Sequence, residues 1–273
     1  MYKIEVLIAT MHKENEKDII ILLDDMDINS DCVVVSQCNK EGVEKFNYKN
    51  YNVVCIYSKE RGLSRSRNLA LQYATADIVM IADDDVQYID GYTEIVVATY
   101  RTYSKYDIIT FKTRNNKKYL CNNKKINRIS SRKITSSEIT MKLSSVRGIS
   151  FNVLFGTGSS CFLHGEENIF LNSCIRRKRK ILYIPQTIAY SESASFVENK
   201  RPSTWFAGYN REYMIDQGAL YYELSPFLFL PSMLQFVFRK YSLYKKNMNC
   251  LTVIYYMVLG VSKYKKILSN MSK

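Results

Sequence analysis

Three consecutive aspartates follow an apolar run in the stretch "TADIVMIADDDVQY", residues 75 to 88. Carboxylates placed this closely repel one another, so they need either solvent or a bound cation. Strand alternation would place Asp83 and Asp85 on one side and Asp84 on the other. At the carboxyl end of a strand, two such carboxylates form half of a site for Mg²⁺ or Mn²⁺, which phosphate and water would complete. The alternative is a solvated acidic turn that caps the next helix.

A second acidic pair, Glu166 and Glu167, follows the glycine-rich segment "FGTGSSCFLHG", residues 155 to 165. Acids in the first turn of a helix commonly do no more than complement its dipole. If a phosphate-bound cation lies at the aspartates, a carboxylate across the cleft can instead act as general base on an incoming hydroxyl. The residues alone leave both interpretations open.

These groups must be positioned by strands and helices that alternate along the first hundred residues. Such alternation predicts a parallel sheet covered by helices on both faces. Short β-branched runs predict strands over residues 3–9, 32–37, 51–58 and 77–82. Helical length and spacing predict helices over residues 14–26, 63–75 and 91–104, with a further strand over 107–113. The chain is therefore expected to have an α/β fold.

Local signals are less regular in the second half of the chain. Gly62 is expected to allow a tight turn, with Ser64 as the N-cap of the following helix. Residues 114–150 are polar and basic, and predict loops with an irregular small sheet. Periodicity returns with a helix that begins near Glu166 and leads into a short strand ending before Pro185.

Composition limits the class of protein. An apolar content of 47% with 13% aromatic residues is typical of a globular chain and excludes a disordered one. The seven cysteines are odd in number and never form a C-x-x-C pair, which indicates a reducing compartment without a disulfide framework or zinc ribbon. The first ten residues lack the features of a secretory signal, so a cytoplasmic location is expected.

The net charge of +13 is regional. Residues 112–133 carry nine Lys and Arg and no acid, and residues 224–273 carry eight and no acid. The second region also holds two apolar stretches of about 12 residues, too short to cross a bilayer as a helix. Such a basic, aromatic segment suits an anionic membrane surface, and its alternative is a pair of helices that pack on the catalytic core or on a second subunit, with a solvated basic face.

The order of four segments adds a resemblance to a known family. "IAT" after the first strand, "RGLSRSRN" before the fourth, "ADDD" after it and "GEENIF" downstream resemble the inverting nucleotide-sugar glycosyltransferases of family 2, which have a GT-A fold. The similarity covers about residues 3–215 and is greatest to members from bacterial capsule, exopolysaccharide and lipopolysaccharide gene clusters. It implies a GT-A catalytic domain over 1–223, with a nucleotide-sugar half (1–111) and an acceptor half (112–223), and helices over 224–273.

The resemblance implies a donor site on the first half of the chain. Thr10 and Asn39 would border the nucleobase, although the family often has an acid where Asn39 stands. Asp85, with Asp83, would hold the Mn²⁺ or Mg²⁺ ion that bridges the diphosphate. The other implied donor-binding residues match the family's arginine-rich segment and its aspartates, and they are Arg61, Arg67, Asn68, Asp83 and Asp84.

The resemblance also implies the catalytic and acceptor residues. Glu167 takes the place of the usual aspartate of a Glu-Asp pair as catalytic base, and its side chain is longer by one methylene. Glu166 would orient Glu167 or the acceptor. Gly158, His164 and Trp205 would border the acceptor, where the plain alternatives are a turn glycine, a surface histidine and a core tryptophan. Ser191 stands near the place where relatives often have a histidine.

Together these features predict a metal-dependent inverting hexosyltransferase of surface polysaccharide biosynthesis. Its donor would be a nucleotide sugar, with UDP favoured, and its acceptor a lipid-linked oligosaccharide at the inner face of the cell membrane. A nucleic-acid-binding protein is the main alternative because of the basic segments, but it leaves the aspartates unexplained, so no nucleic acid is expected as a partner. An inactive glycosyltransferase-like scaffold is the third hypothesis, because Glu167 replaces the usual aspartate.

Overall fold

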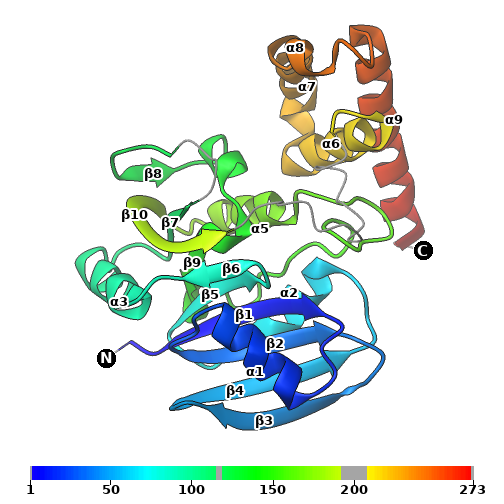
Figure 1. The fold of residues 1–273 in the computed structure, drawn as a ribbon. Helices are drawn as coiled ribbons and strands as arrows, with labels where there is room; N and C mark the ends of the chain where they lie inside the picture. Colours follow the sequence, from blue (N-terminus) through cyan, green and yellow to red (C-terminus); the bar gives the residue numbers. More distant parts are fainter. Residues whose placement is uncertain (1, 115–118, 192–207, 272–273) are drawn as a thin grey trace.

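A single mixed sheet organises the computed structural model, which describes residues 2–114, 119–191 and 208–271 (Figure 1). Its first half is mainly parallel, because β1 (Ile4–Met11) pairs in parallel with both β2 (Asp31–Gln37) and β5 (Ile78–Asp83), and β2 pairs in parallel with β4 (Tyr51–Ser58). Its second half is mixed, and β8 (Lys124–Ile126) pairs with β10 (Ile181–Ser191) beside the main path. Across the described part of the sheet the strands follow the order β3 (Gly42–Tyr48), β4 (Tyr51–Ser58), β2 (Asp31–Gln37), β1 (Ile4–Met11), β5 (Ile78–Asp83), β9 (Ile139–Lys142), β7 (Ile108–Arg114), β10 (Ile181–Ser191) and β6 (Val86–Tyr88).

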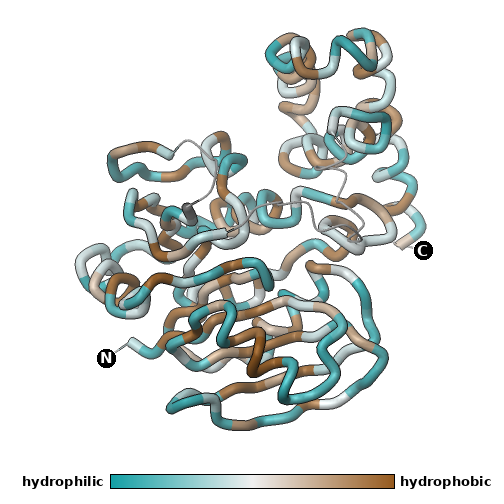
Figure 2. The backbone as a smooth tube through the Cα atoms, in the orientation of Figure 1, coloured by the Kyte–Doolittle hydropathy of each residue, from teal (hydrophilic) through white to brown (hydrophobic). Residues whose placement is uncertain are grey.

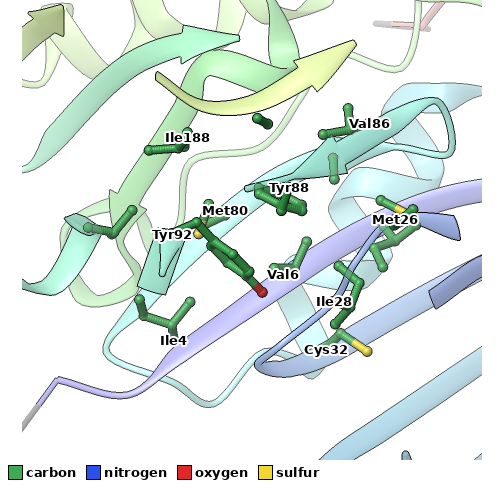
Figure 3. Close-up of a cluster of buried hydrophobic side chains, with 14 of the residues drawn as sticks. Ile4, Val6, Met26, Ile28, Cys32, Met80, Val86, Tyr88, Tyr92 and Ile188 are labelled. Atoms are coloured by element: carbon green, nitrogen blue, oxygen red, sulfur yellow. The ribbon is translucent and has the colours of Figure 1, made fainter. Parts of the chain in front are cut away.

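Helices cover both faces of this sheet because its central strands are apolar on both sides. In β1, Val6 and Ile8 enter one hydrophobic cluster and Leu7 enters another. The first cluster lies under α1 (Glu16–Asp25) and α3 (Tyr92–Thr102), and Figure 3 shows Tyr92 of α3 beside Ile4 of β1. The second cluster lies under α2 (Leu63–Tyr73) and α5 (Glu166–Arg176). Figure 2 shows the apolar residues along the central strands.

The structure confirms the α/β fold and corrects several local predictions. The strand expected to end before Pro185 continues to Ser191 as part of β10. Pro185 lies where the register between β10 and β7 shifts, between Tyr183 and Thr187, so the strand accommodates it. The N-cap of α2 is Gly62, not Ser64, whose hydroxyl donates instead to the Phe155 carbonyl at 2.7 Å. The weakly periodic middle contributes β9, a strand inserted between β5 and β7, with the single turns η1 (Ser130–Lys133), η2 (Ser136–Glu138) and α4 (Leu143–Val146).

Helices follow the sheet at the C-terminal end and pack on one another. They are α6 (Arg211–Leu224), η3 (Pro226–Leu228), α7 (Phe229–Arg239), α8 (Tyr241–Tyr244) and α9 (Cys250–Met271). α6 and α9 cross closely at two glycines, since a Cβ on Gly218 would lie 2.0 Å from the Met257 carbonyl oxygen and one on Gly260 would lie 1.9 Å from that of Ile215. Within the described ranges, none of the helices has the length and apolar character needed to span a bilayer.

Candidate active site

Polar side chains meet at the carboxyl ends of β1 and β5, where ligands of parallel sheets bind. Thr10 of β1 is buried, and its hydroxyl donates to Asp84 Oδ2 at 2.8 Å. β5 ends at Asp83, so strand alternation does not govern Asp84 and Asp85, which lie in the turn before β6. The three carboxylates therefore have different partners, and Ser191 of β10 donates to Asp85 Oδ2 at 3.5 Å.

A buried arginine joins the two acidic segments. Arg67 of α2 is 1% exposed, and it donates to Asp83 Oδ1 at 2.8 Å and to Glu166 Oε1 at 2.9 Å. Although burial alone would lower the pKa of Arg67, the charges of Asp83 and then Glu166 outweigh it and raise that pKa. Arg67 thus stays charged and fixes the first turn of α5 against the end of β5. Arg67 was expected to bind the donor, and its pairing with Asp83 and Glu166 was not predicted.

Asp83 receives a second hydrogen bond, which no local sequence pattern predicts. The hydroxyl of Ser136 donates to Asp83 Oδ2 at 2.9 Å. Ser136 begins η2, in the segment whose weak periodicity predicted only loops and an irregular sheet. Both carboxylate oxygens of Asp83 therefore have protein donors, and the side chain is 32% exposed.

Glu167 lies beside the buried ion pairs at the start of α5. The residue as a whole is half-buried. Burial of its carboxyl group raises the pKa of Glu167, and the negative charge of Glu166 raises that pKa further. A backbone hydrogen bond and the charge of Arg67 act in the opposite direction without cancelling this effect. A carboxylate whose pKa lies well above the ordinary glutamate range is suited to accept a proton near neutral pH.

Two of the predicted donor residues, Arg61 and Asn39, lie together just beyond the carboxyl ends of β4 and β2. Arg61 is exposed, and its guanidinium donates to the Cys38 carbonyl at 2.9 Å and to Asn39 Oδ1 at 3.2 Å. Asn39 is exposed as well. Asn68 has a different environment, because its side-chain amide donates to the Phe151 carbonyl at 2.9 Å and accepts from the Phe151 amide at 2.7 Å. Asn68 therefore anchors a loop to α2.

The glycine-rich loop is joined to the start of α2. The Leu63 amide donates to the Thr157 carbonyl at 2.9 Å. Gly158 has φ of +78°, and a Cβ there would lie 3.3 Å from the Gly62 Cα atom. Gly156 has φ of +109°, and a Cβ there would lie 3.2 Å from Glu166 Cδ. Glycine is required at both positions because the backbone is left-handed and its neighbours are close.

The other side of this loop contacts α9. The ring of Tyr264 lies 5.6 Å from that of Phe155 and 5.8 Å from that of Phe162, measured between centroids. Lys263 donates to the Cys161 carbonyl at 2.9 Å. The hydroxyl of Tyr264 donates to Glu223 at the end of α6 at 2.6 Å. Residues of the C-terminal helices therefore form part of the support of the loop that precedes Glu166 and Glu167.

His164 is buried in this loop instead of lying at the surface. Its ring stacks on Tyr213 of α6 at 5.1 Å, and its Nε2 lies 3.3 Å from Gln217 Oε1. Burial lowers the pKa of His164 to about 4, against a smaller opposing effect of the Gln217 hydrogen bond, so the ring is neutral at pH 7. Trp205, the third residue predicted to border the acceptor, lies outside the described residues.

No group of three or more His, Cys, Asp or Glu side chains suited to a metal ion occurs in the described ranges. Carboxylate oxygens are nevertheless the ligands that Mg²⁺ and Mn²⁺ prefer, and Mg²⁺ is commonly held by one or two carboxylates together with substrate phosphates. Asp84 is half-buried and Asp85 exposed at the edge of the sheet. Of the two carboxylates expected to hold the ion, Asp85 fits this role by its exposure, whereas both oxygens of Asp83 accept hydrogen bonds from the protein.

The sheet, with carboxylates at the carboxyl edge of its parallel half and helices on both faces, defines a GT-A type α/β fold. The family model for Glycosyl transferase family 2 matches residues 4–156, more than half of the chain. The chain belongs to this family. No curated protein matches it.

Solved structures of TarS from S. aureus share the fold. TarS 1-349 in complex with UDP is 14% identical with a TM-score of 0.57, and the match covers 99% of this chain and 91% of that one. The complex with UDP-GlcNAc is 16% identical with a TM-score of 0.53, covering 90% of this chain and 74% of that one. A longer TarS structure is 16% identical with a TM-score of 0.52, and the match covers 69% of this chain but only 36% of TarS.

Proposed function

We propose that the chain transfers a sugar from a nucleoside-diphosphate sugar to an acceptor hydroxyl with inversion at the anomeric carbon. The observation that carries this proposal is the joining of Asp83 and Glu166 through Arg67, which brings the aspartate turn and the first turn of α5 to one site. The raised pKa of Glu167 suits a base in the same place. TarS structures with UDP and UDP-GlcNAc support a nucleotide-sugar donor, with UDP favoured.

Each residue of this site has a separate part in the proposed reaction. Glu167 takes the proton of the acceptor hydroxyl as that oxygen attacks the anomeric carbon from the face opposite the leaving diphosphate. Glu166 is held by Arg67 and fixes the position of the first turn of α5. Because Glu166 is buried, we assign it a positioning role. Glutamate at position 167 reaches about one C–C bond further than aspartate, roughly 1.5 Å, so α5 must lie slightly further from the acceptor.

The donor would bind along the carboxyl edge of the parallel strands. Thr10 and Asp84 are joined there, and Arg61 with Asn39 forms an exposed pair suited to the nucleobase. We assign Asp85 as a ligand for Mg²⁺ or Mn²⁺ because it lies exposed at the carboxyl edge of the sheet, and both oxygens of Asp83 accept hydrogen bonds from the protein. Such an ion, when bound, would stabilise negative charge on the leaving diphosphate.

The proposal also includes an acceptor and a location in the cell. We infer a hexosyl transfer to a lipid-linked oligosaccharide of a surface polysaccharide, at the cytoplasmic face of the cell membrane. The absence of acids from residues 224–273, against eight Lys and Arg, supports a location beside anionic lipid. We place the acceptor beside the loop around Gly158, which precedes Glu167 and contacts the start of α2.

The proposal is tested by thermal denaturation of the protein with UDP, GDP, CMP and dTDP sugars, each with and without Mn²⁺. We expect one nucleotide to raise the melting temperature in a Mn²⁺-dependent way, and Asp85→Ala to abolish the shift. Asp90→Ala is the matched control, because Asp90 is an exposed aspartate just after β6. No shift with any nucleotide, together with salt-sensitive binding to RNA or DNA, would instead favour a nucleic-acid-binding protein.

The same preparation separates an enzyme from an inactive scaffold. Glu167→Gln should retain nucleotide binding and lose release of the nucleoside diphosphate from the donor. Equal release by wild type and variant would remove Glu167 from the mechanism. Donor binding without any release, even when lipid-linked acceptors from a bacterial extract are added, would favour the scaffold.

A further inference from the structure

An apolar ridge lies exposed on α7 and the turn before it. We define this ridge by Phe227, Leu230, Leu234 and Phe238. Phe227 is 96% exposed and Phe238 is 73% exposed, with Leu230 at 58% and Leu234 at 38%. Single exposed apolar residues are common on protein surfaces, but a contiguous set of large ones indicates a binding surface.

The ridge follows from the sequence period of α7. Leu230, Leu234 and Phe238 are four residues apart, so they follow one another along one side of the helix. The residues that pack on α9 and α6, Met233, Phe236 and Val237, belong to the hydrophobic cluster of the C-terminal helices. The apolar arc of α7 is therefore wider than the part of it that the protein buries. A helix with such an arc requires a second apolar surface.

Basic residues accompany the ridge. Arg239 is the last residue of α7 and Lys240 is its C-cap, and Lys245 and Lys246 follow α8. Figure 1 shows α8 at the end of these helices that lies away from the sheet. Acidic residues are absent from positions 224–273 of the sequence. Apolar side chains beside Lys and Arg, without acids, are typical of helices that lie in the interface of an anionic bilayer.

We infer that the ridge inserts into the headgroup region of an anionic membrane, with α7 lying along the surface. The alternative occupant is a second copy of this chain, which would bring the same acid-free set of cations against the first. Like charges at such a contact repel, whereas anionic headgroups are complementary to them. The inference deepens the proposed function by assigning the membrane contact to one helix, and its test does not need a sugar donor.

The test measures sedimentation of the full chain with vesicles of phosphatidylcholine, with and without phosphatidylglycerol. We expect binding to the anionic vesicles, weakened in concentrated salt because screening shortens the reach of the basic residues. Leu230→Ser with Phe238→Ser should weaken partitioning by about tenfold for each side chain removed. Ile129→Ser is the matched control, because Ile129 is an apolar residue that is 75% exposed but lies outside the C-terminal helices. This variant should leave partitioning unchanged.

The charge part of the inference has its own variant. Lys245→Gln with Lys246→Gln should reduce binding to anionic vesicles, while Lys17→Gln on α1 should not. Binding that is absent, or unchanged in the ridge variant, would overturn the inference. A dimer in solution that the ridge variant dissociates would also overturn it, in favour of a second copy as occupant. Nucleotide-dependent thermal stabilisation should be the same in all these variants, so failure here leaves the donor site untouched.

Discussion

Replacement of Arg67 by methionine tests whether the buried ion pairs hold the site together. The side chain of Glu166 is 8% exposed, so Arg67→Met would leave it as a buried carboxylate without its cation. Removing one partner of a buried pair costs about 3–5 kcal/mol in the free energy of unfolding. Asp83 contributes less to this cost, because its side chain is 32% exposed and retains the Ser136 hydrogen bond.

The double variant Arg67→Met with Glu166→Met makes the test sharper. When both partners of a buried ion pair are replaced by apolar residues, the free energy of unfolding often changes little. Arg67 Nε is also buried without a hydrogen-bond partner in the described structure, so its loss removes a further cost. We therefore expect the double variant to be more stable than Arg67→Met alone.

Urea unfolding at constant pH measures both effects, with Arg65→Met as control. Arg65 lies on the same helix but is 47% exposed at the side chain, 3.7 Å from Glu60, so its loss should cost about 0.5 kcal/mol or less. A cost below about 1 kcal/mol for Arg67→Met would refute the reasoning, as would a double variant whose cost equals the sum of the two single variants.

Three further predictions concern Glu167, α9 and its crossing with α6. The raised folded pKa of Glu167 means that the stability contributed by its neutral form is complete below the pKa of unfolded glutamate and is lost as pH rises through the folded value. As pH rises from acid to alkaline, the wild type should therefore lose free energy of unfolding relative to Glu167→Gln, as measured by urea unfolding. A difference between the two proteins that does not change with pH would contradict this. Gly260→Ala should cost about 1–3 kcal/mol, because its Cβ would lie 1.9 Å from the Ile215 carbonyl oxygen, whereas exposed Ser262→Ala should be neutral. Tyr264→Ala should cost about 3–5 kcal/mol by leaving a cavity and Tyr264→Phe only about 1 kcal/mol, and equal costs for the two in thermal or urea unfolding would show that the hydroxyl, not the ring, matters.

The four central parallel strands could be predicted because each has a run of β-branched residues of its own. β4 has the expected bounds and β1, β2 and β5 differ from prediction by one or two residues, since β-branched runs buried on both faces are unambiguous. β3 escaped prediction because "GVEKFNY" is an edge strand whose side chains are mostly exposed. β9 has only four residues, and it becomes a strand through its partners β5 and β7.

The candidate site could be predicted by residue type but not by pairing. The position of the aspartates after a buried strand was sufficient to place them at the edge of the sheet. The partner of Glu166 is 99 residues away in the sequence, and Ser136 is 53 residues from Asp83. Such contacts depend on which distant segments the sheet brings together, and a local sequence pattern does not predict this. His164 shows the same limit, since the ring that stacks on it, Tyr213, belongs to α6, which follows later in the chain.

The contact of α9 with the glycine-rich loop has a consequence for the order of events during synthesis. Lys263 and Cys161 are 102 residues apart, so the ribosome makes the loop long before it makes the helix that supports it. At about 5–20 residues per second, this interval is roughly 5–20 s. During that time Phe155 and Phe162 lack the ring of Tyr264, although the strands β1, β2, β4 and β5 are already made. The nascent chain thus has its sheet before its loop is supported, and a chaperone that shields exposed aromatic residues would act in this interval.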